Sequence, residues 1–171
     1  AITSAVNSGL REFYHPPPLH DGEASYDWSF LKPMATLSLA ASTVTVPLPD
    51  DYGGVEGRVV ITTQPSSSWW PLDFTGVGRV YEQQARLPSA TGRPQLCCEE
   101  PLKGTTGTRG QRFQLRFWPI PDQAYTLQFQ YYLLPDALSP PFPYIYGGAA
   151  HAEAILAACK ACGACAAACP Q

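Results

Sequence analysis

Two stretches of strict alternation constrain the fold more than any other feature of this sequence. They are RFQLRFW at 112–118 and AYTLQFQYY at 124–132. In both, large apolar residues recur at every second position: Phe113, Leu115 and Phe117, then Tyr125, Leu127, Phe129 and Tyr131. Successive side chains of a β-strand point to opposite faces, so both stretches predict half-buried strands. The PIPDQ segment between them is typical of a tight reversal, and we expect a β-hairpin over 112–132.

Shorter segments upstream extend this pattern into a β body over 34–132. LPDDYGG has the composition of a turn, whereas VGRVYEQQA fits a strand or a short helix equally well. LKGTTGTRGQ, rich in Gly and Thr, indicates a polar loop over 102–111. The segments that predict further strands are MATLSLA, TVTVPL, RVVITT and, between prolines, GRPQLCCEEP.

The two ends of the chain are predicted to be helical. Ile2, Val6, Leu10 and Phe13 lie on one face of a helix over 2–14, which the prolines of HPPP end. The aromatic segment YDWSFL should anchor the end of this helix. A Pro-rich crossover over 133–148 then leads into a closing, Ala-rich helix over 149–169. Helix, antiparallel β body and helix make an α+β protein, which we interpret as a single domain over 1–171.

Composition excludes several classes of function. Only 15% of the residues are charged, the net charge is −3, and no run of Lys or Arg suggests a protein that grips nucleic acid. No stretch approaches the ~20 apolar residues of a membrane span, and no signal peptide is visible. Of the six cysteines, two are adjacent and four crowd the end of the chain, so we expect no disulfide scaffold and a reducing compartment. The chain begins without Met, and its apolar residues have helical spacing from the start. We therefore expect residues upstream of it.

The last residues contain a cysteine run with the spacing of bacterial ferredoxins. Cys159, Cys162, Cys165 and Cys169 follow the pattern C-x2-C-x2-C-x3-C-P, which could hold an iron–sulfur cluster. In two-cluster ferredoxins the fourth Cys serves another cluster, and the sequence has no second run; Cys97 or Cys98 could help only if the fold brought it near. In a continuous helix, Cys162, Cys165 and Cys169 would instead share one packing stripe. We favour the helix and expect no cofactor.

The remaining motifs indicate neither an enzyme nor a metal site. The sequence has no GxSxG, P-loop or GxGxxG motif. His15 and His20, with Asp21 or Glu23, do not have the spacing of a metal site. The adjacent pairs Asp50–Asp51 and Glu99–Glu100 would point to opposite faces of a strand, so we interpret them as turn or solvent charges.

Aromatic residues in the predicted loops are candidates for contacts with other molecules. Trp69 and Trp70 stand in a Ser/Pro-rich loop, where one ring could tuck under the loop or both could bind a neighbouring subunit. The same pair, with the Tyr-rich strands, would also suit a carbohydrate- or surface-binding β module. Further interface candidates lie in and after the Pro-rich crossover: Tyr144, Tyr146 and His151.

The order of these elements resembles the head-to-tail adaptor (head-completion, connector) proteins of tailed bacteriophages. The resemblance rests on AVNSGLREFYHPP leading into YDWSFLKP, on TLSL and VTVPLPDDY, on GQRFQLRFWPIPDQAYTLQFQYYLLPDAL, and on PYIYGGAAHAEAILAAC. It covers most of the chain.

The resemblance implies a structural virion protein at the neck of the particle, made in the host cytoplasm. Such proteins form a ring, commonly twelvefold, beneath the portal protein. Their terminal helices pack together and against the portal, and the β body faces neighbouring subunits and the next tail or stopper protein. Packaged double-stranded DNA passes down the lumen, also during ejection, without sequence-specific binding. A negative net charge suits a channel in which DNA slides.

Overall fold

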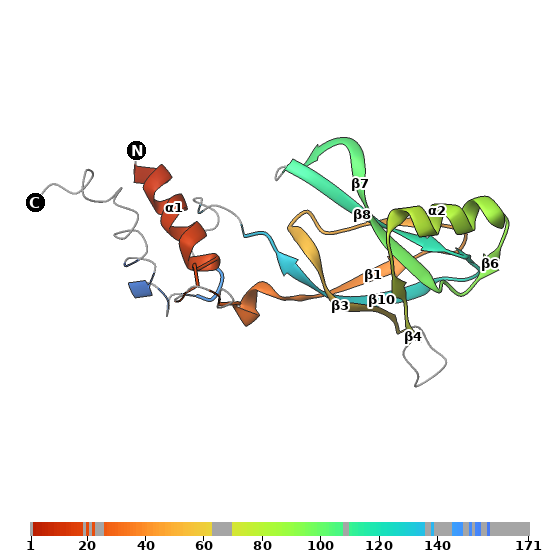
Figure 1. The fold of residues 1–171 in the computed structure, drawn as a ribbon, viewed down its shortest axis with the longest axis horizontal. Coiled ribbons are helices and arrows are strands. Elements are labelled where there is room, and N and C mark those ends of the chain that lie inside the picture. The colour runs from red at the N-terminus through yellow and green to blue at the C-terminus, as the bar shows by residue number, and fades with distance from the viewer. Residues whose placement is uncertain are drawn as a thin grey trace, which may run out of the picture. The chain divides into compact units, whose positions relative to one another are not determined.

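The computed structural model divides the chain into two compact units (Figure 1). One unit comprises Ala1–Leu31 with Pro135–Gln171, and the other, the β body, comprises Lys32–Leu134. That the chain is a single domain stays a prediction. The structure describes residues 2–18, 20, 22, 26–62, 70–107, 110–135, 138, 145–148, 151, 153–154 and 157, with the side chains of all of these except 2–5 and 103–111.

The β body contains two four-stranded sheets and one two-stranded sheet, with strand orders β1-β10-β3-β4, β2-β8-β7-β5 and β6-β9. Neighbouring strands are antiparallel except in the pairs β5–β7 and β6–β9. With the helices, this confirms the α+β class. The strands are β1 (Met34–Leu39), β2 (Thr45–Pro47), β3 (Tyr52–Ile61), β4 (Trp70–Pro71), β5 (Asp73–Phe74), β6 (Thr91–Gly92), β7 (Leu96–Gly107), β8 (Gly110–Trp118), β9 (Ile120–Pro121) and β10 (Tyr125–Leu133).

The core of the β body follows the alternation seen in the sequence. Along β10 every odd-numbered residue from Tyr125 to Leu133 is buried and every even-numbered one is partly exposed. Leu115 and Phe117 of β8 are fully buried as well. The ring of Tyr52 in β3 contacts both Phe113 of β8 and Tyr131 of β10, so the two larger sheets share this apolar core.

The predicted hairpin over 112–132 is wrong, although both of its strands exist. β8 pairs with β7 and β2, whereas β10 pairs with β1 and β3. The connection between them carries the chain from one sheet into the other, and on the way Ile120 donates a backbone hydrogen bond to the carbonyl of Ala90 at 2.9 Å. Two strands that face each other across a core alternate in the same way as two strands of one hairpin, so the pattern could not distinguish these arrangements.

The partner of β8 in a hairpin is β7, which corrects the predicted loop at 102–111. Most of that segment belongs to the strands β7 and β8, and the two run antiparallel as far as the pair Gly107 and Gly110. Glycine suggested a loop, but threonine is β-branched and favours strands. Local composition therefore gave the wrong element.

The segment that fitted a strand or a helix is a helix, α2 (Val77–Arg86). Its buried Val80 packs in one cluster with Leu96, Cys98 and Trp118 of the sheet that contains β7 and β8. Cys97, next to Cys98 on β7, points the other way and is also fully buried. The strand β7 is thus covered on both faces, by α2 on one and by the shared core on the other.

The other unit contains the predicted first helix, α1 (Ile2–Tyr14), with the bounds expected from the sequence. The predicted aromatic anchor is confirmed: the indole nitrogen of Trp28 donates a hydrogen bond to the carbonyl of Phe13 at 2.8 Å, and their rings lie 5.1 Å apart. A short 3-10 helix, η1 (Ser29–Leu31), places Phe30 against Trp28. The end of α1 is therefore held by aromatic packing and by the hydrogen bond from the partly buried indole of Trp28.

Replacing Trp28 with phenylalanine should loosen α1, because the ring is largely kept and the hydrogen bond to Phe13 is lost. A typical hydrogen bond contributes about 1 kcal/mol, so the amides of α1 should exchange with solvent about fivefold faster. Residue-resolved hydrogen exchange measures this. The control is Tyr26→Phe, since the Tyr26 hydroxyl forms no hydrogen bond among the described residues. An equal effect of both substitutions would contradict the role given to the indole N–H.

Most of the predicted closing helix falls outside the described residues. Glu153, Ala154 and Ala157 are helical in backbone, and each is exposed. The packing of the two terminal helices against each other stays a prediction, as does most of the Pro-rich crossover.

Candidate interaction surface

Exposed apolar side chains concentrate in the segment 70–87, which contains β4, β5 and α2. Among the described residues nine large hydrophobic side chains are exposed, and five of them belong to this segment. They are Trp70, Phe74, Val77, Tyr81 and Leu87. Large exposed apolar side chains are candidates for contacts with another protein, and this segment carries more of them than any other described segment of similar length.

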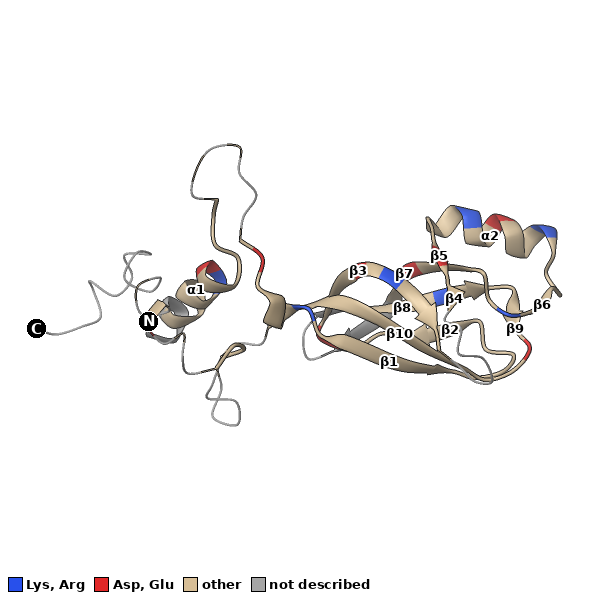
Figure 2. Ribbon diagram, turned by 90° about the horizontal axis from the view of Figure 1, so that it is seen from below, with Lys and Arg blue, Asp and Glu red and all other residues tan. Residues whose placement is uncertain are grey.

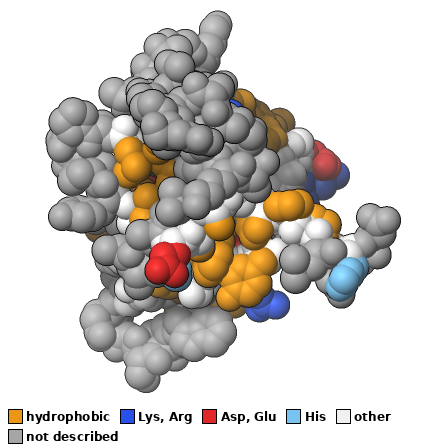
Figure 3. All heavy atoms as spheres, turned by 90° about the vertical axis from the view of Figure 1, so that its left-hand side faces the viewer, with side chains coloured by type: hydrophobic (Ala, Val, Ile, Leu, Met, Phe, Trp, Pro, Cys, Tyr) orange, Lys and Arg blue, Asp and Glu red, His pale blue; other side chains and the backbone are white. Residues whose placement is uncertain are grey.

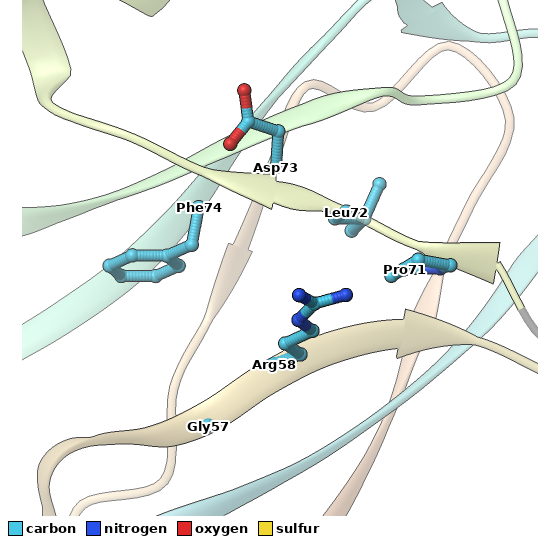
Figure 4. Close-up of a pocket in the computed structure, with 6 residues that line it drawn as sticks. All are labelled: Gly57, Arg58, Pro71, Leu72, Asp73 and Phe74. Carbon is cyan, nitrogen blue, oxygen red and sulfur yellow. The ribbon is translucent and has the colours of Figure 1, made fainter.

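A groove of about 420 Å³ lies beside this segment (Figure 4). Gly57 and Arg58 of β3 line one side, and Pro71, Leu72, Asp73 and Phe74 line the other. Gly57 has a φ of +77°, a conformation that other residues rarely adopt, and the pairing of β3 with β10 is irregular at this point. The Arg58 guanidinium extends toward the opposite strand and has no ion-pair partner among the described residues.

Arginine is the basic residue of the segment, which contains no lysine. Arg79 pairs with Asp73 at 3.2 Å, and the guanidinium of Arg93 lies 3.9 Å from the centre of the Trp70 ring. Figure 2 shows both signs of charge on α2, where Arg86 lies 3.7 Å from Glu82. Trp, Tyr, Phe and Arg are the residues enriched in protein interfaces, whereas Lys is depleted there. The segment 70–87 with Arg58 is therefore the best candidate for an interaction surface in the β body.

Behind α2 lies a buried carboxylate that the sequence did not indicate. Glu100 of β7 is 7% exposed and accepts hydrogen bonds from Nε and Nη2 of Arg116, each at 2.9 Å. Gln114 and the Tyr81 hydroxyl donate to the same carboxylate. Burial by itself raises the pKa of Glu100, but the hydrogen bonds from Arg116, Gln114 and Tyr81 outweigh it and hold the pKa below its ordinary value.

This cluster corrects the interpretation of Glu99–Glu100 as solvent charges. The two side chains do point to opposite faces of β7, but neither is a free surface charge. Glu99 accepts a hydrogen bond from the Tyr52 hydroxyl inside the β body, where burial first and this carboxylate second raise the pKa of Tyr52. Glu100 fastens α2 to the sheet through Tyr81. Asp50 and Asp51 do lie in the predicted turn, in which Asp50 pairs with Arg112 at 2.8 Å.

The cysteines that the structure describes are two free thiols, Cys97 and Cys98, both fully buried. Burial raises the pKa of Cys97 to about 12, so this thiol is inert at neutral pH. The run Cys159, Cys162, Cys165 and Cys169 lies outside the described residues. So do Asp21 and Glu23, whereas His15 is exposed. In the described part of the chain, no three His, Cys, Asp or Glu side chains are grouped closely enough to hold a metal ion.

The predicted interface residues are placed as follows. Trp70 is 42% exposed on β4, and Tyr146 is 37% exposed in the other unit, where its backbone N–H lies 3.2 Å from the Tyr14 hydroxyl. His151 is half-buried against three rings, those of Phe13, Trp28 and Phe30, at centroid distances of 5.5–5.7 Å. Trp69 and Tyr144 lie outside the described residues. The interface role of all five stays a prediction.

Apolar side chains also reach the surface of the unit that contains α1. Tyr26 is 64% exposed and contacts Trp28 edge to face at 4.7 Å. Figure 3 shows one face of the chain, on which most of the described side chains that can be seen are hydrophobic. Of the helices in the described residues, none has the length and apolar character needed to cross a bilayer.

These observations define an α+β protein whose surface is suited to contacts with other proteins. The family model of the SU10 adaptor protein matches residues 1–167, and the chain belongs to this family of phage head–tail adaptors. The resemblance stated from the sequence is thereby confirmed. No curated protein matches the chain. The family is structural and implies no enzyme activity; membership makes the chain an adaptor protein of the phage virion.

Proposed function

We propose that this chain forms a ring, commonly twelvefold in such proteins, between the portal and the tail of the phage particle. The terminal segments contact the portal protein, and the β body contacts neighbouring copies and the next tail or stopper protein. The proposal is carried by one observation, the family match over residues 1–167. The particle neck is the place where such a ring acts.

The exposed segment 70–87 supports contacts between copies. A ring needs a heterologous interface, in which one surface of a subunit meets a different surface of the next. Trp70 and Phe74 supply apolar area, and the guanidinium of Arg58, which has no ion-pair partner among the described residues, suits a carboxylate of the neighbour. The net charge of −3 means that the rest of the chain carries an excess of acidic residues that could meet it.

The same charge supports a lumen through which double-stranded DNA moves during packaging and ejection. Proteins that grip DNA neutralise phosphates with many Lys and Arg side chains. This sequence has only 11 basic residues and 14 acidic ones. A contact along which the DNA slides is therefore favoured over a sequence-specific one.

We further propose that the adaptor needs no cofactor. Its terminal cysteines would then belong to a helix, and the purified protein would be colourless. Iron and labile sulfide, measured after anaerobic purification, provide the test. Stoichiometric iron with absorption near 400 nm would favour the cluster suggested by the cysteine spacing.

The ring is tested by the mass of the purified protein alone and after mixing with the portal protein. Native mass spectrometry should show closed assemblies of many copies, alone or on the portal. A strict monomer under both conditions, with no affinity for the portal, would contradict the proposal.

Two substitutions should weaken ring assembly if the segment 70–87 is the subunit contact. Trp70→Ala removes an aromatic anchor and Arg58→Glu reverses the charge in the groove. Substitution of an interface anchor costs about 2 kcal/mol or more, so each variant should assemble at least ~30-fold more weakly, as measured by the concentration dependence of the assembled mass. The matched controls are Tyr26→Ala and Arg11→Glu in the other unit. If the Trp70 and Arg58 variants assemble at the same protein concentration as the wild type, this surface is not the contact between subunits of the ring.

A further inference from the structure

One edge of the sheets lacks the features by which proteins prevent edge strands from pairing. An edge strand exposes a row of unpaired N–H and C=O groups, and natural sheets protect such rows with short strands, prolines, charges or bulges. In the two larger sheets of the β body the edges are β1 and β4 in one and β2 and β5 in the other; the third sheet, β6 with β9, has strands of only two residues.

Three of these four edges are protected. β4 and β5 have two residues each, and β4 contains Pro71. β2 has three residues and contains Pro47. β1 is different: its six residues, MATLSL, include no proline and no charge, and its pairing with β10 runs without a register shift.

The register shows which backbone groups of β1 face outward. Tyr131 donates to the carbonyl of Pro33, so Pro33 and Tyr131 form a hydrogen-bonded pair. Such pairs alternate along an antiparallel ladder, and Ala35, Leu37 and Leu39 therefore bond to β10. The N–H and C=O groups of the residues between them point away from β10: Met34, Thr36 and Ser38.

These outward groups form no hydrogen bond among the described residues. Met34 is 64% exposed, and Thr36 and Ser38 are exposed as well. Three donors and three acceptors at strand spacing are complementary to one kind of ligand, another extended chain. Leu37, on the core side of β1, is only partly buried, so the added strand would complete its burial.

We propose that β1 receives a strand from the next tail or stopper protein, which extends the sheet by one strand. This rests on the proposed ring. A second copy of the adaptor is the poorer occupant for two reasons. Its other described edges are protected, and two β1 strands paired with each other would form a two-fold contact that closes on two subunits.

The occupant is an extended segment of about six residues, matched to the length of β1. The residue opposite Leu37 is apolar, because it covers that side chain. The residues opposite Thr36 and Ser38 are small or polar, since they share the exposed face. The backbone hydrogen bonds between β1 and the added strand then provide the affinity, and every second side chain of the added strand provides the specificity.

Hydrogen exchange of the β1 amides tests this inference. In the isolated adaptor, the amides of Met34, Thr36 and Ser38 should exchange quickly, whereas those of Ala35 and Leu37 are protected by β10. In purified particles the first three should slow by about tenfold or more. Unchanged exchange in particles would overturn the inference. Protection already present in the isolated adaptor would show that β1 is covered by this chain or by a second copy of it, and would also overturn the inference.

Mass spectrometry of the same particles separates this result from a failure of the proposed function. If the adaptor is absent from particles, both proposals fall; if it is present with unprotected β1 amides, only strand addition falls. A second arm uses Thr36→Pro, which removes one outward donor but no bond to β10, with Thr36→Val as its control. Thr36→Pro should keep the wild-type fold by circular dichroism and still enter the ring, but its particles should lose the tail component. Wild-type particles from this variant would contradict the inference.

Discussion

Replacing Phe117 with alanine is expected to destabilise the β body by about 3–5 kcal/mol. Phe117 has no exposed surface and pairs with Cys97, which is also fully buried, so the space left by the ring is closed on all sides. The free energy of unfolding, from urea denaturation followed by circular dichroism, measures the loss.

Phe74→Ala is the matched control for this substitution. It removes the same atoms from a side chain that is 40% exposed, and the cost should stay below about 1 kcal/mol in the isolated protein. Equal losses for Phe74 and Phe117 would contradict the position of the core. If Phe74 contributes to the ring, its substitution weakens assembly and leaves the stability of the subunit nearly unchanged.

The second large effect is expected at Glu100. Glu100→Gln keeps the shape of the side chain but leaves the partly buried guanidinium of Arg116 without its counter-charge, at a cost of about 2–4 kcal/mol at pH 7. The control is Asp73→Asn, which breaks an ion pair whose side chains are 55% and 56% exposed and should cost less than about 1 kcal/mol. Thermal unfolding of both variants gives the comparison.

The pH dependence of this difference follows from the lowered pKa of Glu100. A carboxylate whose pKa is lower in the folded protein binds its proton more readily when unfolded, so folding is favoured wherever the carboxylate is charged. The difference in the free energy of unfolding between wild type and Glu100→Gln should reach its maximum above pH 4.5, the ordinary pKa of a Glu side chain. It should become smaller as the pH falls below this value. A difference that stayed constant from pH 7 to pH 3 would show that the charge of Glu100 does not stabilise the fold.

Periodic sequence patterns predicted the elements of this chain well. The four-residue spacing of α1 and the two-residue spacing of β10 each depend on one local requirement, an apolar face, and both elements lie where these patterns indicated. Strand pairing depends instead on contacts between distant segments. β8 and β10 therefore looked like a hairpin although they belong to different sheets.

The candidate sites were harder to predict for the same reason. Trp70 could be recognised as exposed from its neighbours in the sequence, but the groove exists only because β3 lies next to the segment that follows Trp70. The Glu100 cluster needs the register of β7 on β8, which sets Glu100 opposite Gln114 and beside Arg116. One signal was present: Gln114 and Arg116 are the polar residues between the buried positions of β8 and would suit a buried acid on a neighbouring strand.

The central proposal is that this chain forms the adaptor ring of a phage neck, and an image of that neck tests it most directly. Electron cryomicroscopy of purified particles, combined with quantification of the chain by mass spectrometry, gives its position and its copy number together. The account predicts density for the α+β fold repeated around the channel between portal and tail, with about as many copies as the portal has subunits. Absence of the chain from particles, or its presence only at a site away from the portal, would contradict the account.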